Sequence, residues 1–482
     1  NYKTESSNYL NNVQSILDQA VYAQEEAKNE VLRIIAQWIN GKMKGYCFGF
    51  EGPPGTGKTS LAKNGISNCL VDEKGNKRPF IFIALGGSSN GSTLEGHSYT
   101  YVGSTWGRIV DILMEQKCMN PIIFIDELDK VSKTEHGKEI IGILTHMVDP
   151  TQNEHFQDKY FSGIDFNLSR ILFIFSYNNP ELIDPILLDR IHRIKFKNLS
   201  LEDKVIITKK HILPELFKRV GMTNTVEFSD DIIKYIIENY TKEAGVRKLK
   251  EILFEIISEI NLEIIQSTDE KFYHYVLTEE DIKNKYLKER LTVRYKEIHH
   301  ENRVGIINGL WANALGMGGI IPIESNYFPS AKMLELKLTG MQGDVMKESM
   351  NVAMTLAWKL SSDKTQKAIM KENGKNNLKG IHIHCPEGAV PKDGPSAGTA
   401  ITCCIYSLLN KKPINRLYAI TGEIDLQGNI TAIGGLDLKI LGGIRAGVKH
   451  FIYPEENKKE FDKFLELYKD IDIINNIEFF SV

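Results

Sequence analysis

The amino-acid sequence predicts a multi-domain protein whose first part is an α/β core with a parallel sheet. Its 482 residues exceed what one hydrophobic core can order, and a prior of about one domain per 150 residues suggests roughly three. Four short apolar runs are separated by helical segments, which is typical of buried parallel strands. The runs are residues 46–52, 80–87, 121–127 and 170–178.

Changes of pattern along the chain set the expected boundaries. Residues 1–45 are predicted to be helical, because apolar residues recur near a 3.6-residue period from Ile16 to Ile39. From Ser200 the pattern is helical alone, beginning with a capping box in "SLED". After a charged stretch, alternating strand patterns return among helices. We therefore expect an α/β domain with a helical lead (1–198), a small all-α lid (199–282), a linker (283–302) and an α+β domain (303–482).

Composition and charge exclude several classes of protein. With 42% hydrophobic and 25% charged residues, the chain is neither disordered nor fibrous. The formal net charge of -3 provides no global basic field, so nucleic acid is expected only as a secondary ligand. The 6 cysteines form no C-x-x-C pair, which favours a reducing compartment.

The sequence gives little information on the subcellular location of the protein. The longest apolar stretches fall short of the roughly 18 residues that span a bilayer, so a soluble intracellular protein without a membrane partner is expected. Cytosol and organelle matrix are not distinguished. The chain begins at Asn1 without a signal pattern, and it is expected to be a fragment or a processed form.

A glycine-rich motif directly after the first apolar run predicts a phosphate site. It fits G-x-x-x-x-G-K-[ST] and leads into a helical segment. The glycines would let backbone N–H groups wrap phosphates, the lysine would neutralise the β- and γ-oxygens, and the last hydroxyl would bind Mg²⁺. A purely structural glycine turn is the alternative. The motif consists of Gly52, Pro53, Pro54, Gly55, Thr56, Gly57, Lys58 and Thr59.

Two carboxylates end the third apolar run. Asp126 and Glu127 close "IIFIDE", and ligands of open α/β sheets lie at the carboxyl ends of the strands. Asp126 would hold Mg²⁺ through water, and Glu127 would polarise the attacking water. A solvated acidic strand end is the alternative, and the neighbouring phosphate motif disfavours it.

Three further polar residues fit the same chemistry. Asn178 follows the fourth apolar run and could position the hydrolytic water. Arg190 in "LLDR" could reach the γ-phosphate of a neighbouring subunit, and Arg247 in "EAGVRKL" could contact the phosphates from the helical domain. Each taken alone could be a polar cap or a surface arginine. Their order together indicates an AAA+ ATPase, which acts as a ring because an arginine in trans requires a neighbour.

Ser396 lies in a second motif of interest. Gly394-Pro395-Ser396-Ala397-Gly398 fits G-x-S-x-G, the nucleophile elbow of α/β-hydrolases. That fold needs an acid and then a histidine after the serine, but the one histidine beyond Ser396 is His450 and no strand directly precedes the motif. A hydrolase elbow is therefore disfavoured. A serine near a helix N-terminus, favourable for an oxyanion, or a plain N-cap serine both fit.

A lysine can activate a serine if burial keeps its amine neutral. In a helix starting after Gly435, Lys439 would share one face with Leu436, Ile440 and Gly443, and that face is otherwise apolar. An amine buried there would lose its proton readily. The alternative is a lysine whose stem follows the apolar rim while its charge reaches water, which is the commoner arrangement.

The chain resembles the Lon ATP-dependent protease family. The resemblance rests on motifs in family order and covers about Ile16 to Val482. It implies an AAA+ module fused to a serine–lysine protease domain, working as a homohexameric ring that unfolds protein substrates and cleaves them in a sealed chamber with ATP and Mg²⁺. The motifs are "GPPGTGKTSLA", "TYVGSTWG", "FIDELDK", "DPILLDRI", "EAGVRKLK", "HIHCPEGAVPKDGPSAG" and "TGEIDLQGNITAIGGLDLK".

The resemblance assigns roles residue by residue. Ser396 matches the nucleophile and Lys439 the general base. Thr421 matches the hydroxyl that orients the lysine, and Asp393 is a nearby acid of the same motif. Tyr101 and Val102 match the pore loop that grips the translocating chain. Asp126, Glu127, Asn178, Arg190 and Arg247 match the ATPase roles given above.

Three departures from the family pattern stand out. A large N-terminal recruiting domain is expected in soluble members, but this sequence has only a short lead before Gly52, so either a region is missing or substrates are selected differently. Residues 68–79 form a longer segment than usual, with no assigned role. Where the family commonly has His-Tyr-Gly near adenine, this chain has Val-Tyr-Ala, in which Tyr22 could still pack on the base.

Two other functions compete with an energy-dependent protease. A non-proteolytic AAA+ remodeller would use the third domain only as a scaffold, and retention of both Ser396 and Lys439 argues against it. A DNA-acting ATPase such as a clamp loader is disfavoured by the near-neutral charge.

Overall fold

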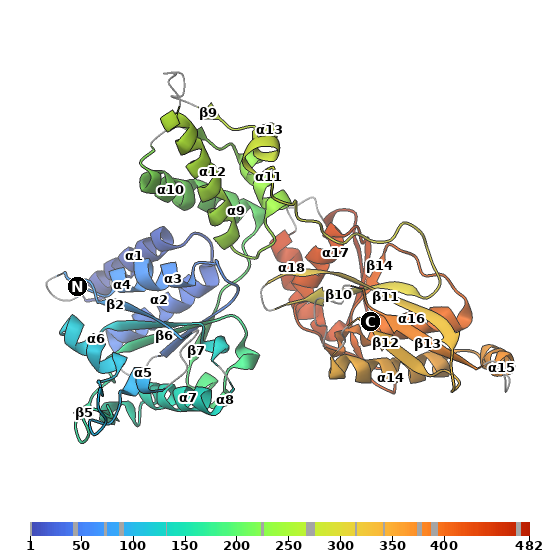
Figure 1. The fold of residues 1–482 in the computed structure, drawn as a ribbon, viewed down its shortest axis with the longest axis horizontal. Helices are drawn as coiled ribbons and strands as arrows, with labels where there is room; N and C mark the ends of the chain where they lie inside the picture. The colour runs from blue at the N-terminus through green and yellow to red at the C-terminus, as the bar shows by residue number, and fades with distance from the viewer. Residues whose placement is uncertain are drawn as a thin grey trace. The chain divides into compact units, whose positions relative to one another are not determined.

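The computed structural model describes the chain in two compact units, residues 1–293 with 314–316, and residues 294–313 with 317–482. Figure 1 labels the elements of both units. The described residues are 2–41, 47–71, 75–85, 91–131, 133–222, 226–266, 275–313, 316–340, 343–373, 378–386, 394–468 and 474–482.

A five-stranded parallel sheet forms the centre of the first unit, in the order β2-β3-β6-β1-β7. The predicted parallel α/β core is thereby confirmed. The four longest strands coincide with the four apolar runs of the sequence. The strands are β1 (Cys47–Glu51), β2 (Phe80–Ala84), β3 (Ile122–Asp126), β6 (Leu172–Tyr177) and β7 (His192–Lys195), beside the small hairpin β4 (Phe156–Gln157) and β5 (Asp165–Phe166).

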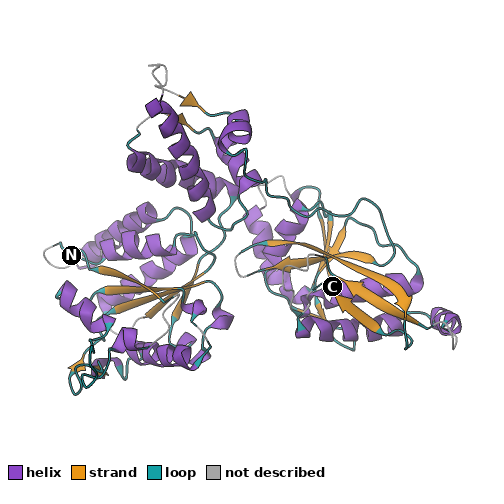
Figure 2. Ribbon diagram, in the orientation of Figure 1, coloured by secondary structure: helices purple, strands orange, loops and turns teal. Residues whose placement is uncertain are grey.

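Helices cover both faces of this sheet (Figure 2). Because side chains alternate along a strand, Phe124 packs into one hydrophobic cluster with α1 and α2, while Ile123 and Ile125 pack into another with α6 and α7. The helices are α1 (Tyr2–Ala20), α2 (Glu25–Asn40), α3 (Lys58–Ser60), α4 (Ser67–Cys69), α5 (Ser92–Glu95), α6 (Arg108–Gln116), α7 (Glu135–Val148) and α8 (Pro185–Leu188); a π-helical turn, Leu61–Ile66, joins α3 to α4.

The helical lead consists of two helices. Residues 1–45 are predicted to be helical, and in the structure α1 ends at Ala20 and α2 begins at Glu25. Ala23 and Gln24 both adopt left-handed backbone conformations, with φ of 63° and 60°. The 3.6-residue periodicity runs across this break because both helices pack apolar faces on the same cluster.

The predicted helical lid is confirmed as a helical region, although it is not all-α. Ser200 caps α9 in a capping box with Asp203. A short parallel pair of strands, β8 with β9, accompanies the helices. The elements are α9 (Leu201–Ile207), α10 (Leu213–Val220), α11 (Asp230–Tyr240), α12 (Arg247–Gln266), α13 (Glu279–Asp281), β8 (Val226–Glu227) and β9 (Tyr275–Val276). The expected linker begins within a helical turn, Ile282–Tyr286, that belongs to this unit.

The second unit contains a mixed seven-stranded sheet in the order β12-β13-β11-β10-β14-β17-β18. Antiparallel pairing joins β11 to β10 and β13, and the other pairs are parallel, as expected of an α+β domain. The strands are β10 (Ile306–Ala312), β11 (Gly318–Pro329), β12 (Leu336–Thr339), β13 (Lys379–His384), β14 (Tyr418–Ile420), β17 (His450–Tyr453) and β18 (Glu478–Ser481), and β15 (Glu423–Ile424) pairs with β16 (Ile430–Thr431). The helices are α14 (Asp344–Leu360), α15 (Asp363–Glu372), α16 (Gly398–Asn410), α17 (Leu436–Arg445) and α18 (Lys458–Tyr468).

Candidate functional site

The glycine-rich loop after β1 has a backbone shape that only glycine adopts readily. Gly52, Gly55 and Gly57 have φ of 151°, 75° and 102°. A Cβ atom on Gly52 would lie 2.5 Å from the Phe196 carbonyl oxygen, so the neighbouring backbone leaves no room for a side chain. The loop therefore presents its main chain rather than side chains, as phosphate-binding loops do.

Lys58 is buried at the base of this loop. Its amine donates hydrogen bonds to the Pro53 carbonyl oxygen at 3.1 Å and to the Asn178 side-chain oxygen at 3.0 Å, and it also contacts the Gly52 carbonyl. Burial lowers the pKa of Lys58 to about 8, although the carboxylates of Asp126 and Asp129 oppose that shift. An anion at the loop would restore the charged state, since an opposite charge favours the ammonium.

Asp126 and Glu127 lie together at the carboxyl end of β3. The Glu127 N–H donates to the Asp126 carboxylate at 3.0 Å. Glu127 has a φ of 61°, a left-handed conformation that is uncommon outside glycine and recurs at functional sites. Its carboxylate contacts the amine of Lys130.

Asp129 lies in the "FIDELDK" motif without an assigned role, and its carboxylate fixes Asn178. One oxygen of Asp129 accepts hydrogen bonds from the N–H groups of both Asn178 and Asn179, each at 3.0 Å. Asn178 in turn contacts the amine of Lys58. Asp129 thus holds the end of β6 against the lysine.

Arg247 begins α12, and its main chain packs on the glycine-rich loop. The neighbouring Val246 N–H donates to the Gly55 carbonyl at 3.1 Å. A Cβ atom on Gly55 would lie 2.9 Å from the Arg247 nitrogen, so glycine at that position permits the close approach. The Arg247 side chain itself is exposed.

The segment around Tyr22 also contacts the glycine-rich loop. A Cβ atom on Gly57 would lie 2.9 Å from Val21, and Gln24 donates to the Thr56 carbonyl at 3.4 Å. Gln24 also exchanges hydrogen bonds with the Lys197 main chain at 2.7 and 2.8 Å. Tyr22 is half-buried, with the amine of Lys210 5.5 Å from its ring centre.

Arg190 does not contact the loop of its own chain. Its guanidinium donates two hydrogen bonds to one oxygen of Asp149, at 3.1 and 3.0 Å, and one to the Ile186 carbonyl at 2.9 Å. The residue is exposed. The structure therefore presents Arg190 at the surface in a fixed orientation.

Tyr101 and Val102 lie at the tip of an exposed loop, 70% and 107% exposed. The base of the loop is held firmly. The Gly107 N–H donates to the buried carboxylate of Asp158 at 2.7 Å, and the Trp106 ring stacks on Phe161 with centres 6.0 Å apart.

In the second unit, Ser396 lies in a 3-10 turn, Pro395–Ala397, directly before α16. Its side chain does not cap the helix, for which Ala397 is the N-cap. The first N–H groups of α16 are already used, since Gly398 donates to the Pro395 carbonyl and Thr399 to the Gly422 carbonyl at 3.1 Å. The plain N-cap alternative for Ser396 therefore does not apply.

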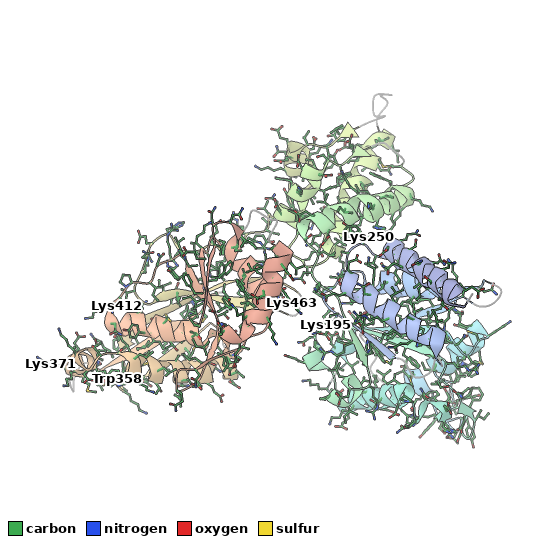
Figure 3. All side chains as sticks on the ribbon, turned by 180° about the vertical axis from the view of Figure 1, so that it is seen from behind. Lys195, Lys250, Trp358, Lys371, Lys412 and Lys463 are labelled. Carbon is green, nitrogen blue, oxygen red and sulfur yellow. The ribbon has the colours of Figure 1, made fainter. Side chains whose placement is uncertain are left out.

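Lys439 lies on α17, which begins at Leu436 as the sequence predicts. Leu436, Lys439, Ile440 and Gly443 all lie on its buried face. The lysine residue is 4% exposed, and burial lowers its pKa to about 8. Lysines such as Lys371 and Lys463, by contrast, project from the surface (Figure 3).

Thr421 connects the serine segment to the lysine. Its hydroxyl donates to the Ser396 carbonyl oxygen at 3.3 Å and accepts a hydrogen bond from the Lys439 amine at 3.3 Å. The Gly422 N–H also donates to the Ser396 carbonyl, at 2.9 Å. The structure thus brings Ser396, Thr421 and Lys439 together, whereas Asp393 lies outside the described residues.

Family models match most of the chain. Residues 48–199 match the ATPase family associated with various cellular activities, residues 218–272 the Lon protease AAA+ ATPase lid domain, and residues 277–479 the Lon protease (S16) C-terminal proteolytic domain. The chain belongs to the Lon protease family. The AAA domain implies that it binds ATP.

Curated Lon proteins resemble the chain along nearly all of its length. It is 37% identical to a Lon protease homolog of Acanthamoeba polyphaga mimivirus, over 99% of this chain and 52% of that protein. It is 36% identical to a Lon protease of Clostridium acetobutylicum, over 96% and 57% of the two chains. The chain therefore spans about half the length of the curated Lon relatives it matches.

Arg78 lies near the end of residues 68–79, the segment that the sequence comparison with the family singles out, and its side chain contacts the sheet. Its guanidinium contacts the carbonyl oxygens of Asn120 and Arg170, which precede β3 and β6. The Arg78 main chain is bonded to Leu70 and Ser67 at 2.9 and 2.8 Å. Arg78 therefore ties the start of β2 to the amino ends of β3 and β6.

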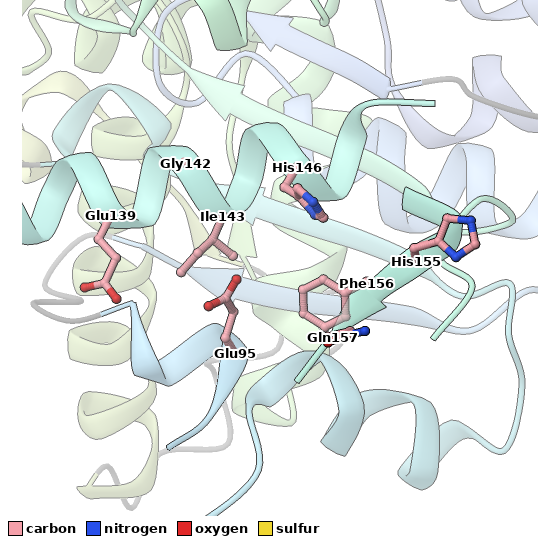
Figure 4. Close-up of a pocket in the computed structure, with 8 residues that line it drawn as sticks. All are labelled: Glu95, Glu139, Gly142, Ile143, His146, His155, Phe156 and Gln157. Carbon is pink, nitrogen blue, oxygen red and sulfur yellow. The ribbon is translucent and has the colours of Figure 1, made fainter. Parts of the chain in front are cut away.

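A surface pocket of about 490 Å³ lies elsewhere in the first unit (Figure 4). Its carboxylates are compensated, because the Lys159 amine lies 3.3 Å from Glu95 and 3.2 Å from Glu139.

Within the described ranges, histidine, cysteine and carboxylate side chains form no group of three or more suited to a metal. Among the same residues, no helix combines the length and apolar character needed to cross a membrane.

Proposed function

We propose that this chain works as an ATP-dependent serine endoprotease, which unfolds protein substrates and cleaves their peptide bonds with Ser396 and Lys439. The observation that carries the proposal is the bridge through Thr421, which joins a buried lysine of depressed pKa to the segment that bears the serine. A buried amine of this kind is costly to keep without a use.

The nucleotide site supports ATP hydrolysis. Its residues fit a nucleoside triphosphate with Mg²⁺, because the loop offers main-chain groups and an amine, while Thr59 and Asp126 offer the oxygen atoms that Mg²⁺ prefers. Bound ATP would supply the free energy for unfolding. Glu127 would take a proton from the attacking water, and Asn178, held by Asp129, would orient that water. Arg247 would contact the phosphates from α12, and Tyr22 would pack on the base.

Peptide cleavage would follow in two stages. The neutral Lys439 amine accepts the Ser396 hydroxyl proton while the oxygen attacks the substrate carbonyl carbon. The C–N bond then breaks, and the departing amine takes the proton from Lys439, which leaves an ester on Ser396. Water attacks this ester with Lys439 again accepting the proton, and the acid product leaves as the serine hydroxyl is restored.

The proposal includes a homohexameric ring. Arg190 is exposed and hydrogen-bonded to Asp149 rather than to its own glycine-rich loop, which fits an arginine that acts on a neighbour's γ-phosphate. Tyr101 and Val102 would face the pore and grip unfolded chain. Such a ring would work inside the cell, and nucleic acid would be at most a secondary ligand.

The decisive experiment compares the parent chain with Ser396→Ala. We expect the variant to lose ATP-dependent degradation of an unfolded protein and to retain ATP hydrolysis. Degradation that continued in Ser396→Ala would refute the serine assignment.

A non-proteolytic remodeller is the alternative. It makes a different prediction for a serine-reactive peptide boronate, which should label the protease and leave a remodeller unlabelled. Loss of that label in Ser396→Ala would exclude the remodeller.

A further inference from the structure

Helix α17, which carries Lys439, has no cap of its own at its N-terminus. The N-cap residue is Gly435, in a left-handed conformation with a φ of 67°, and it has no side chain to offer. The first helical N–H, that of Leu436, donates instead to a carboxylate oxygen of Glu460 at 3.1 Å. Glu460 belongs to α18, so a separate helix supplies the cap.

Two neighbours of Glu460 hold the segment that leads into α17. Glu456 accepts a hydrogen bond from the Ala432 N–H at 2.7 Å. Asn457 accepts from the Ile433 N–H at 2.9 Å and donates to the Ile433 carbonyl at 2.8 Å. We call Glu456, Asn457 and Glu460 the α18 clamp.

Asn457 also orients Glu460. Its side-chain amide donates to the second carboxylate oxygen of Glu460 at 3.0 Å, and Asn457 is buried. Both oxygens of Glu460 are therefore engaged, one by the start of α17 and one by Asn457. A carboxylate fixed in this way has a defined distance to every group on α17.

Glu460 is the charged group that acts on the Lys439 amine, raising its pKa against the effect of burial. The strands packed on α17 add little charge, because β10 has no ionisable side chain and β11 carries Glu324 and Tyr327. On α17 itself the charges are Asp437 and Arg445. The remaining charged groups on α18 and the preceding turn are Glu455, Glu456, Lys458, Lys459, Asp462, Lys463 and Glu466.

We propose that Glu460 is a positioning residue for Lys439, fixing the start of its helix and setting the electrostatic potential at its amine, with Asn457 locking the carboxylate in place. The proposal rests on the proposed function, in which Lys439 is the base. It adds a residue from α18 that touches neither substrate nor serine.

The sign of the effect follows from the charge. A negative neighbour stabilises the ammonium, so removing it makes the amine lose its proton at lower pH. The acid limb of peptide hydrolysis, which reports deprotonation of the base, should then move to lower pH. A residue with a purely structural role would lower the rate without moving this limb.

The experiment measures hydrolysis of a short unstructured fluorogenic peptide by the full chain across pH. Glu460→Gln keeps an oxygen for the Leu436 N–H but removes the charge, and we expect its acid limb to lie lower by several tenths to about one pH unit. Glu460→Asp keeps the charge and should restore the parental limb. The matched control is Glu456→Gln, which loses a charge from the same clamp but not one that acts on Lys439, and its limb should coincide with that of the parent.

An unmoved limb in Glu460→Gln, or an equal shift in Glu456→Gln, would overturn the inference. If Glu460→Gln does not fold, Glu460→Ala removes the same charge and must show the same shift. Hydrolysis that survives Ser396→Ala would overturn the proposed function and this inference with it. If hydrolysis depends on Ser396 but the acid limb of Glu460→Gln does not move, this inference is overturned and the proposed function is not.

Discussion

The amine of Lys439 donates a hydrogen bond to the Thr421 hydroxyl at 3.3 Å, in a site where both residues are almost fully buried. The same hydroxyl donates its own proton to the Ser396 carbonyl oxygen. A neutral amine has two N–H bonds and one lone pair. Because the Thr421 hydroxyl accepts a hydrogen bond from one of these N–H groups, fewer directions remain for the lone pair. The amine is thereby held beside the serine segment, where its lone pair can accept a proton.

Replacing Thr421 with valine tests this orientation. Valine has nearly the same shape but cannot hydrogen bond, so the lysine loses its partner while packing is kept. We expect peptide hydrolysis to fall about tenfold, the equivalent of about 1.4 kcal/mol for one hydrogen bond. ATP hydrolysis should be unchanged. Thr421→Ser retains the hydroxyl and should recover most of the rate, whereas an equal loss in both variants would contradict the orienting role.

Local patterns were sufficient to predict much of this molecule. The glycine-rich loop that ends at Lys58, the strand end at Asp126 and the apolar face of the helix that carries Lys439 each follow from short stretches whose periodicity and glycine content are visible directly, whereas the burial of the lysine itself stayed open. These features depend on neighbours within a few residues, which a sequence displays.

The supporting residues could not be found in this way. Asp129 contacts Asn178 across 49 residues, Gln24 contacts Lys197 across 173, and Glu460 caps Leu436 across 24. Contacts between distant segments leave no periodic trace, so a single sequence does not show which partner these side chains have. The break between α1 and α2 is likewise not visible in the periodicity, since both helices present apolar faces to one cluster.

The pH dependence of peptide hydrolysis should report Lys439. Its pKa is lowered to about 8 by burial, and the active form is the neutral amine. The rate should therefore rise about tenfold per pH unit below that value and level off above it. Measuring the rate of peptide cleavage at a series of pH values across this region will define the acid limb of the pH profile. A rate independent of pH through this region would contradict Lys439 as the base.

Arg190 should act on the ATP of a neighbouring subunit. Asp149 holds its guanidinium at the surface, so Arg190→Ala should lower ATP turnover by about 10³-fold while nucleotide binding persists. Arg33→Ala, a change at another exposed arginine, serves as the control. Mixing Arg190→Ala with Lys58→Ala provides the sharper test. In mixed rings, some sites combine an intact Lys58 from one chain with an intact Arg190 from the next. ATP hydrolysis should therefore reappear. If it does not, Arg190 does not act on a neighbouring subunit's ATP.

Tyr101 should be needed for unfolded chain to move and not for peptide bonds to break. Its ring is 70% exposed at a loop tip whose base is fixed by Asp158, so it can contact substrate without rearranging the core. Burying an aromatic side chain against another chain is worth about 1.5–3 kcal/mol, and its loss should slow degradation of a folded protein by about tenfold or more. Tyr99, 65% exposed two residues earlier, provides a matched control as Tyr99→Ala. Short peptides, which need no pulling, should be cleaved at the parental rate by both variants. Equal losses of folded-protein degradation in Tyr99→Ala and Tyr101→Ala would show that the loop as a whole, and not the Tyr101 ring, makes the contact.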